Sequence, residues 1–250
     1  MLEIILPAFV VGLLIAVTHA SLGIEVLKRG IIFIDLAIAQ IAGFGIILAK
    51  LVLGIENWFL WQVLAIFIAF LVCGIFVLVE KKCPEILEAV IGVSFVFFAC
   101  LALLIVSVHV GGAENIVHLL SGEILFVDFS TILHHLPIYL SFFGLWFFCK
   151  GKFKTGLGFY LIFTIVIASS VQLVGVYVVF ASLIVPAIFV FKMKNDQIIA
   201  PVFGVVAICF GILLSVIFDL VAGPMIVISY VGLMVLYYFS RITLHKVKYF

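Results

Sequence analysis

The chain has 250 residues, of which 68% are hydrophobic and only 10% are charged, with a formal net charge of +1. Soluble domains are roughly half apolar and a quarter charged, so the composition excludes an ordinary soluble fold and predicts a polytopic membrane protein. Basic residues are scattered in small groups, which excludes a nucleic-acid-binding surface. The polar segments are too short to form a separate catalytic domain.

Nine apolar runs follow one another along the chain, and each is a candidate membrane helix. A helix needs about 20 residues to cross the hydrocarbon layer, a length that most of the runs reach. The runs cover residues 2–27, 30–50, 60–79, 87–107, 130–149, 156–171, 175–191, 198–218 and 225–240. The sequence therefore predicts an all-α protein with about eight to nine transmembrane helices, forming a single transmembrane domain over residues 1–250.

The helix count depends on the pair of runs 156–171 and 175–191. Two short tilted helices would give nine crossings, whereas one helix with a re-entrant half would give eight full spans. Gly175 lies between the two runs, and Pro186 and Pro224 are further candidate bends. Non-helical backbone at membrane depth is tolerated only against protein or a wet cavity, so such bends often line a transport path; simple packing kinks are the alternative.

The loops alternate between basic and nearly neutral. Lys and Arg gather around residues 28–29, 81–82, 150–154, 192–194 and 241–248, whereas the loops 51–58, 108–131, 170–175 and 219–224 contain almost none. Basic loops face the cytoplasm. We therefore expect a multi-pass protein of a cytoplasmic membrane, with its N-terminus outside and its C-terminus inside.

Asp35 is the strongest candidate for a residue on a transport path. The sequence places it two turns inside the second span, about 9 Å of helix beyond Arg29. Polar groups inside hydrocarbon are costly unless partnered, and usually mark a path for something polar. A salt bridge to a basic loop residue is the alternative. Gln40 lies five residues further along the same span, on a different face.

His19 lies in the middle of the first span, which a tight turn joins to the span of Asp35. Imidazole together with carboxylate suits Zn²⁺ or Mn²⁺ in passage. A hydrogen bond from His19 to a neighbouring helix is the alternative.

The other ionisable residues fall into interfacial groups. Glu25 is expected to pair with Lys28 and Arg29 at helical spacings, and Glu88, at the mouth of the fourth span, remains a candidate for the path. The segment 109–128 contains acidic and imidazole side chains that match no closed metal site: His109, Glu114, His118, Glu123 and Asp128. His134 and His135 are expected at the membrane interface.

The sequence gives little support for catalysis. It contains neither an HExxH nor a GxSxG motif, and a phosphate loop is excluded because Phe153 follows Gly151-Lys152 and Trp146 replaces the first glycine. We expect no enzymatic activity and no cofactor in this chain, so any ATP must be used by a partner subunit. The five cysteines are singly spaced and are interpreted as packing residues.

Four stretches resemble the membrane permease subunit of metal-ion ABC importers, the zinc, manganese and iron permeases. They are LGIEVLKRGIIFIDLAIAQIAGFG, EAVIGVSFVFFACLALLIVS, LLSGEILFVD, and QLVGVYVVFASLIVPA with GILLSVIFDLVAGPMIVI. The resemblance implies a homodimer in a prokaryotic inner membrane, two cytoplasmic ATPase subunits, an extracytoplasmic solute-binding protein, and a divalent metal ion as substrate. Asp35 matches the family's acid in the second span.

Two features depart from that family. A histidine commonly follows the acid by four residues, but here the position is Ala39, with Gln40 beside it; His19 is a candidate replacement. The loop KGKFKTGLGF is also shorter than the segment that is expected to dock the ATPase. The metal-path candidates are therefore Asp35, His19, Gln40 and Glu88.

Three classes of function remain open on the sequence. An ATP-driven metal importer subunit is the leading one, and an ion-coupled or ATPase-independent transporter is the alternative. A membrane scaffold is disfavoured because of the acids within the spans.

Overall fold

The computed structural model describes residues 2–109, 124–148, 156–191 and 193–247, and these form helices joined by short turns. The elements are α1 (Leu2–Arg29), α2 (Ile34–Ile47), the π-helical turn η1 (Leu48–Val52), α3 (Trp58–Lys82), the 3₁₀ turn η2 (Pro84–Ile86), α4 (Leu87–Ser107), the 3₁₀ turn η3 (Ile124–Phe126), α6 (Phe129–Phe148), α7 (Gly156–Phe189), α8 (Asp196–Phe218) and α9 (Ala222–Val247). Of these described helices, seven are long and apolar enough to cross a membrane: α1 to α4 and α7 to α9. The predicted all-α polytopic membrane fold is confirmed. The described residues contain seven candidate spans, where the sequence predicted about eight to nine.

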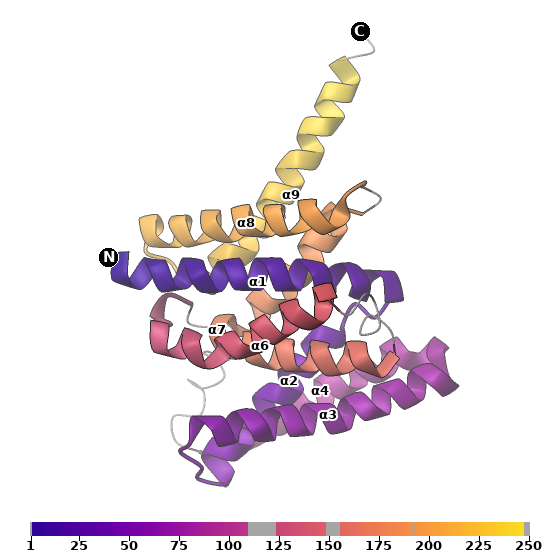
Figure 1. The fold of residues 1–250 in the computed structure, drawn as a ribbon, viewed down its shortest axis with the longest axis vertical. Helices are drawn as coiled ribbons and strands as arrows, with labels where there is room; N and C mark the ends of the chain where they lie inside the picture. The colour runs from indigo at the N-terminus through magenta and orange to yellow at the C-terminus, as the bar shows by residue number, and fades with distance from the viewer. Residues whose placement is uncertain (1, 110–123, 149–155, 192, 248–250) are drawn as a thin grey trace.

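The helices pack around α7. α8 lies between α1 and α9, α1 also packs on α7, and α2 joins α7 to α3 and α4 (Figure 1). In the most apolar window of α7, 78% of the residues are buried, against 17% for α4. α7 is therefore central and α4 peripheral. The C-terminal part of α9 projects beyond the bundle (Figure 1).

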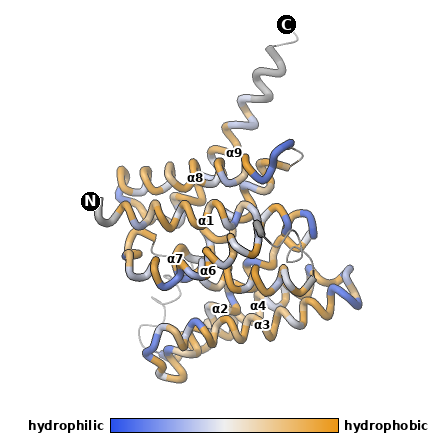
Figure 2. Tube along the Cα trace, in the orientation of Figure 1, coloured by the Kyte–Doolittle hydropathy of each residue, from blue (hydrophilic) through white to orange (hydrophobic). Residues whose placement is uncertain are grey.

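Hydrophilic residues gather at the helix ends and turns, and the middles of the helices are hydrophobic (Figure 2). Local signals explain several of these boundaries. α1 ends after Lys28 and Arg29, at Gly30, which has φ 71°. Glycine readily adopts this left-handed conformation at the end of a helix. The basic side chains also interact favourably with the C-terminal end of the helix dipole. Asn57 caps α3 by accepting a 2.9 Å hydrogen bond from the amide of Phe59.

The predicted depth of Asp35 is wrong. α1 continues to Arg29, and α2 begins only at Ile34, so Asp35 lies in the first turn of α2 rather than two turns inside it. The difference arises because residues 30–33 form a turn instead of the start of a helix. Asp35 is thus near the end of the bundle where α1 ends and α2 begins, which we call the basic end because it contains Lys28 and Arg29.

α7 is broken at one residue. Gly175 has φ 76° and ψ 165°, which is not helical. Ser170 and Ser182 would lie about 18 Å apart on a straight helix, yet their hydroxyls bond to the two nitrogens of a single His19 ring, at 2.9 and 2.7 Å. The chain must therefore fold back at Gly175. The two halves, residues 156–174 and 176–189, are the two short runs expected from the sequence, and the break lies at Gly175 rather than at Pro186.

Replacing Gly175 by alanine should destabilise the protein by about 1–3 kcal/mol, because its backbone conformation is accessible essentially only to glycine. The measurement is the thermal unfolding midpoint of the purified protein in detergent. Gly92→Ala is the matched control, since Gly92 lies in α4 with open space around it. Equal midpoints for the two variants would contradict the predicted strain.

Candidate functional site

Two carboxylates from different helices lie together at the basic end. Asp35, in the first turn of α2, is fully buried, and neither of its carboxylate oxygens has a hydrogen-bond partner in the described part of the chain. Glu88, in the first turn of α4, interacts electrostatically with Asp35. Its Oε1 accepts a 3.1 Å hydrogen bond from the amide of Phe33, and its Oε2 is buried without a partner. Three carboxylate oxygens are therefore available to a ligand.

Such an arrangement favours a cation. A buried carboxylate is costly unless it is paired or hydrogen-bonded, and the helix N-termini here compensate only a partial charge. The nearby basic side chains contact other acids: Lys28 lies 3.6 Å from Glu25 and 3.9 Å from Asp196, and Arg29 lies 3.5 Å from Glu80. The predicted pairing of Glu25 with Lys28 is confirmed. An incoming cation would supply a positive charge that compensates the carboxylates of Asp35 and Glu88.

His19 lies elsewhere. It is fully buried, ten residues before the end of α1 and therefore about 15 Å along that helix from the basic end. Both ring nitrogens are hydrogen-bonded to serine hydroxyls of α7. The structure thus shows the alternative interpretation of His19, in which it is hydrogen-bonded to a neighbouring helix.

A wider polar network surrounds α7. In the described part of the chain, six hydrogen bonds between side chains of different helices each have one partner in α7. They link His19 to Ser170 and to Ser182, Cys73 to Thr164, His135 to Ser169, Tyr139 to Ser170, and Gln62 to Gln172. Hydrogen bonds of this kind hold membrane helices together.

The structure separates His135 from His134, which the sequence treated as a pair at the membrane interface. His135 is only 1% exposed and bonds to Ser169 at 2.7 Å, whereas its neighbour His134 is exposed. The difference follows from the helical rotation, which turns His135 towards α7 and His134 away from it. Sequence reasoning did not select Tyr139, Ser169, Ser170 or Ser182; adjacent serines inside an apolar run were the available signal.

The remaining candidates make no closed metal site. Gln40 is buried in α2, six residues and about 9 Å beyond Ile34. Within the described ranges no group of three or more His, Cys, Asp or Glu could hold a metal ion. In the segment 109–128, Asp128 caps α6 by accepting a 2.8 Å hydrogen bond from the amide of Thr131. Hydrogen bonds from the side chain and the amide of Thr131 lower the pKa of Asp128 below its ordinary value. Glu114, His118 and Glu123 lie outside the described residues, as does most of the loop KGKFKTGLGF.

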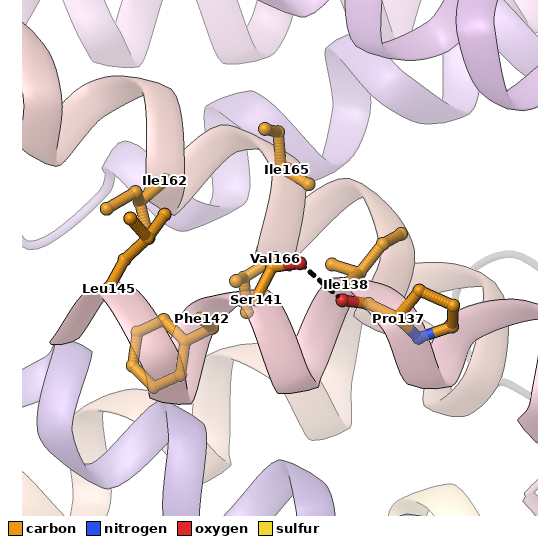
Figure 3. Close-up of a pocket in the computed structure, with 8 residues that line it drawn as sticks. All are labelled: Pro137, Ile138, Ser141, Phe142, Leu145, Ile162, Ile165 and Val166. Carbon is orange, nitrogen blue, oxygen red and sulfur yellow. Dashed lines mark hydrogen bonds between the residues drawn. The ribbon is translucent and has the colours of Figure 1, made fainter. Parts of the chain in front are cut away.

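A cavity of about 240 Å³ lies between α6 and the first half of α7 (Figure 3). Its lining is almost wholly apolar: Pro137, Ile138, Ser141, Phe142, Leu145, Ile162, Ile165 and Val166. The one hydroxyl, of Ser141, donates to the carbonyl of Pro137 at 2.7 Å. This cavity suits a hydrocarbon chain and offers no ligand to a cation.

The model of the ABC 3 transport family matches residues 1–156 and 150–241. The chain belongs to the ABC 3 transport family. It is therefore a multi-pass membrane permease of the ABC type, in which ATP is used by a partner subunit. A comparison with curated proteins finds no match.

Two solved structures share the fold of this ABC 3 family member. One is PsaBC from Streptococcus pneumoniae in complex with Fab, with a TM-score of 0.75 and 20% identity over 94% of this chain and 90% of that one. The other is an inward-facing conformation of a putative metal-chelate type ABC transporter, with a TM-score of 0.58 and 17% identity over 90% of this chain and 76% of that one. At these identities the likeness establishes the fold alone.

Proposed function

We propose that this chain is the permease subunit of an ATP-binding cassette importer that moves a divalent transition-metal ion, zinc, manganese or iron, across a prokaryotic inner membrane. The observation that carries the proposal is the fully buried Asp35, whose carboxylate oxygens have no hydrogen-bond partner among the described residues. Glu88 reaches the same turn, because it accepts a hydrogen bond from the amide of Phe33, two residues before Asp35. Carboxylate oxygens are ligands for hard and intermediate divalent cations. The ion is the substrate, and it passes this pair near the basic end. Gln40 is the next buried amide along α2.

Membership of the family supports the assembly proposed for this chain. The chain works as a homodimer with two cytoplasmic ATPase subunits and an extracytoplasmic solute-binding protein, with its N-terminus outside and its C-terminus inside. The fold-back of α7 supports this orientation, because it returns both ends of α7 to one side of the bundle. A basic loop precedes the first end, at residues 150–154, and another follows the second end, at residues 192–194. The basic loops are then cytoplasmic.

Purification from native membranes distinguishes the importer from an ATPase-independent transporter. We expect an ATPase subunit to copurify in stoichiometric amount, and ATP hydrolysis by the reconstituted complex to rise in the presence of the transported metal and the solute-binding protein. The measurement is phosphate release in lipid nanodiscs, with zinc, manganese and iron tested in turn. Metal uptake by this chain alone in proteoliposomes, driven by an ion gradient, would overturn the importer.

A further inference from the structure

A single imidazole ring bridges the two halves of the broken helix α7. Nδ1 of His19 lies 2.7 Å from Oγ of Ser182, and Nε2 lies 2.9 Å from Oγ of Ser170. Ser170 belongs to the half before Gly175 and Ser182 to the half after it. All three side chains are fully buried. α1 is thus attached to both arms of the hairpin at one point.

Both ring nitrogens of His19 are hydrogen-bonded within the protein, so neither is left to bind a metal ion. A neutral imidazole offers one donor and one acceptor. Each serine hydroxyl can also donate to a carbonyl of its own helix, Ser170 to Val166 at 2.8 Å and Ser182 to Val179 at 3.0 Å. One serine therefore accepts from the ring N–H while the other donates to the bare nitrogen, whichever tautomer is present. Both nitrogens are used within the protein.

We infer that His19 is a positioning residue that fixes the α7 hairpin to α1, so that the two halves of α7 and α1 move together during transport. α1 leads directly through the turn 30–33 into α2, which carries Asp35. A shift of α1 is thereby imposed on both arms of α7 and on the helix that holds the proposed cation site. This role goes beyond the proposed function and does not depend on which cation is carried.

Removal of the bridge should leave the fold intact. In His19→Leu the hydroxyls of Ser170 and Ser182 keep their carbonyl acceptors, so neither becomes an unsatisfied buried donor. The double variant Ser170→Ala with Ser182→Ala removes the same bridge from the other side and leaves the imidazole in place. His135→Leu is the matched control, because His135 is a buried histidine that bonds to Ser169 in the first half of α7 only.

The experiment measures amide hydrogen exchange of the intact protein in nanodiscs, together with metal uptake by the reconstituted complex. His19→Leu loses the two interhelical hydrogen bonds of the bridge, and the double serine variant loses these two together with the bond from Tyr139 to Ser170. In both variants, amides of residues 176–182 should exchange about tenfold faster or more. The maximal uptake rate should fall while the metal concentration for half-maximal uptake stays unchanged. His19→Gln, whose amide also offers a donor and an acceptor, should restore part of the rate. His135→Leu should leave exchange at residues 176–182 unchanged.

Three results would overturn the inference. One is wild-type exchange in the double serine variant, which is the decisive test should His19→Leu fail to fold. Another is a normal uptake rate in the double serine variant combined with lost metal binding in His19→Leu, which would make His19 a ligand instead. The third is a raised half-maximal metal concentration with an unchanged maximal rate. Metal binding by Asp35 variants tests the proposed function separately, because Asp35 is not part of the bridge. Its loss would support the proposed function and would not bear on the role of His19.

Discussion

Replacing Asp35 by asparagine should reduce metal uptake by about 100-fold or more. Removal of a residue that only orients a metal ligand typically costs 10- to 100-fold in affinity or activity, so loss of the charged ligand itself should cost at least the upper figure. The folded state should survive, because asparagine has the same shape and the buried charge disappears. The measurement is the initial rate of radioactive zinc, manganese or iron uptake, normalised to the amount of protein in the membrane.

Glu88→Gln should lower uptake less than Asp35→Asn does. The glutamine oxygen can still accept the hydrogen bond from the amide of Phe33, so only the charge is lost. Asp196→Asn is the matched control, because Asp196 is a partly exposed acid at the same end of the bundle that pairs with Lys28 at 3.9 Å. Exposed ion pairs contribute little to stability, so Asp196→Asn should fold normally and its metal uptake should stay within about twofold of wild type. Wild-type uptake in Asp35→Asn would rule out Asp35 as a ligand.

Gly23→Ala should be the most destabilising single methyl addition at a helix contact. A Cβ at Gly23 would clash with the backbone carbonyl of Leu183 in the second half of α7, and a backbone group cannot move aside as a flexible side chain does. Overpacking of this kind costs about 1–3 kcal/mol and occasionally more. We expect the upper end, about 3 kcal/mol, and a fall in the unfolding midpoint of about 6–12 °C.

The matched control for Gly23→Ala is Gly74→Ala. Gly74 lies in α3 and an added Cβ there meets nothing within 4 Å. Alanine is the better helix former by about 1 kcal/mol, so this variant should be neutral or slightly more stable. Unfolding midpoints of both variants in detergent, together with the fraction of monodisperse protein, are the measurement. A Gly23→Ala protein as stable as the control would contradict the close contact of α1 with α7.

Much of the fold could be predicted because membrane helices reveal themselves through length and hydropathy. The runs predicted at 87–107 and 198–218 correspond to α4 and α8 within two residues. Helix starts after tight turns were harder: Asp35 was placed too deep because the continuous apolar pattern does not reveal that residues 30–33 leave the helix. Apolar residues serve equally well in a buried turn and in a span.

The candidate site was predicted only in part. Asp35 and Glu88 could be selected singly, because acids in apolar surroundings are conspicuous, but their proximity depends on the packing of α2 against α4. His19 was selected for the same reason, although its two serine partners lie more than 150 residues away along the chain. Periodicity does not identify such partners, since the serines are small and their neighbours are apolar.

The sequence by itself determined the all-α membrane architecture, the positions of the spans and the acids that they contain, because these depend on local composition and the roughly fixed thickness of the hydrocarbon layer. Only the tertiary structure decided which polar groups meet. It brought Glu88 to the start of α2 and left both carboxylate oxygens of Asp35 without a hydrogen-bond partner in the described part of the chain. It also used both nitrogens of His19 to bridge the arms of α7. These pairings follow from how the helices cross, and side-chain contacts between distant segments leave no periodic trace in the sequence.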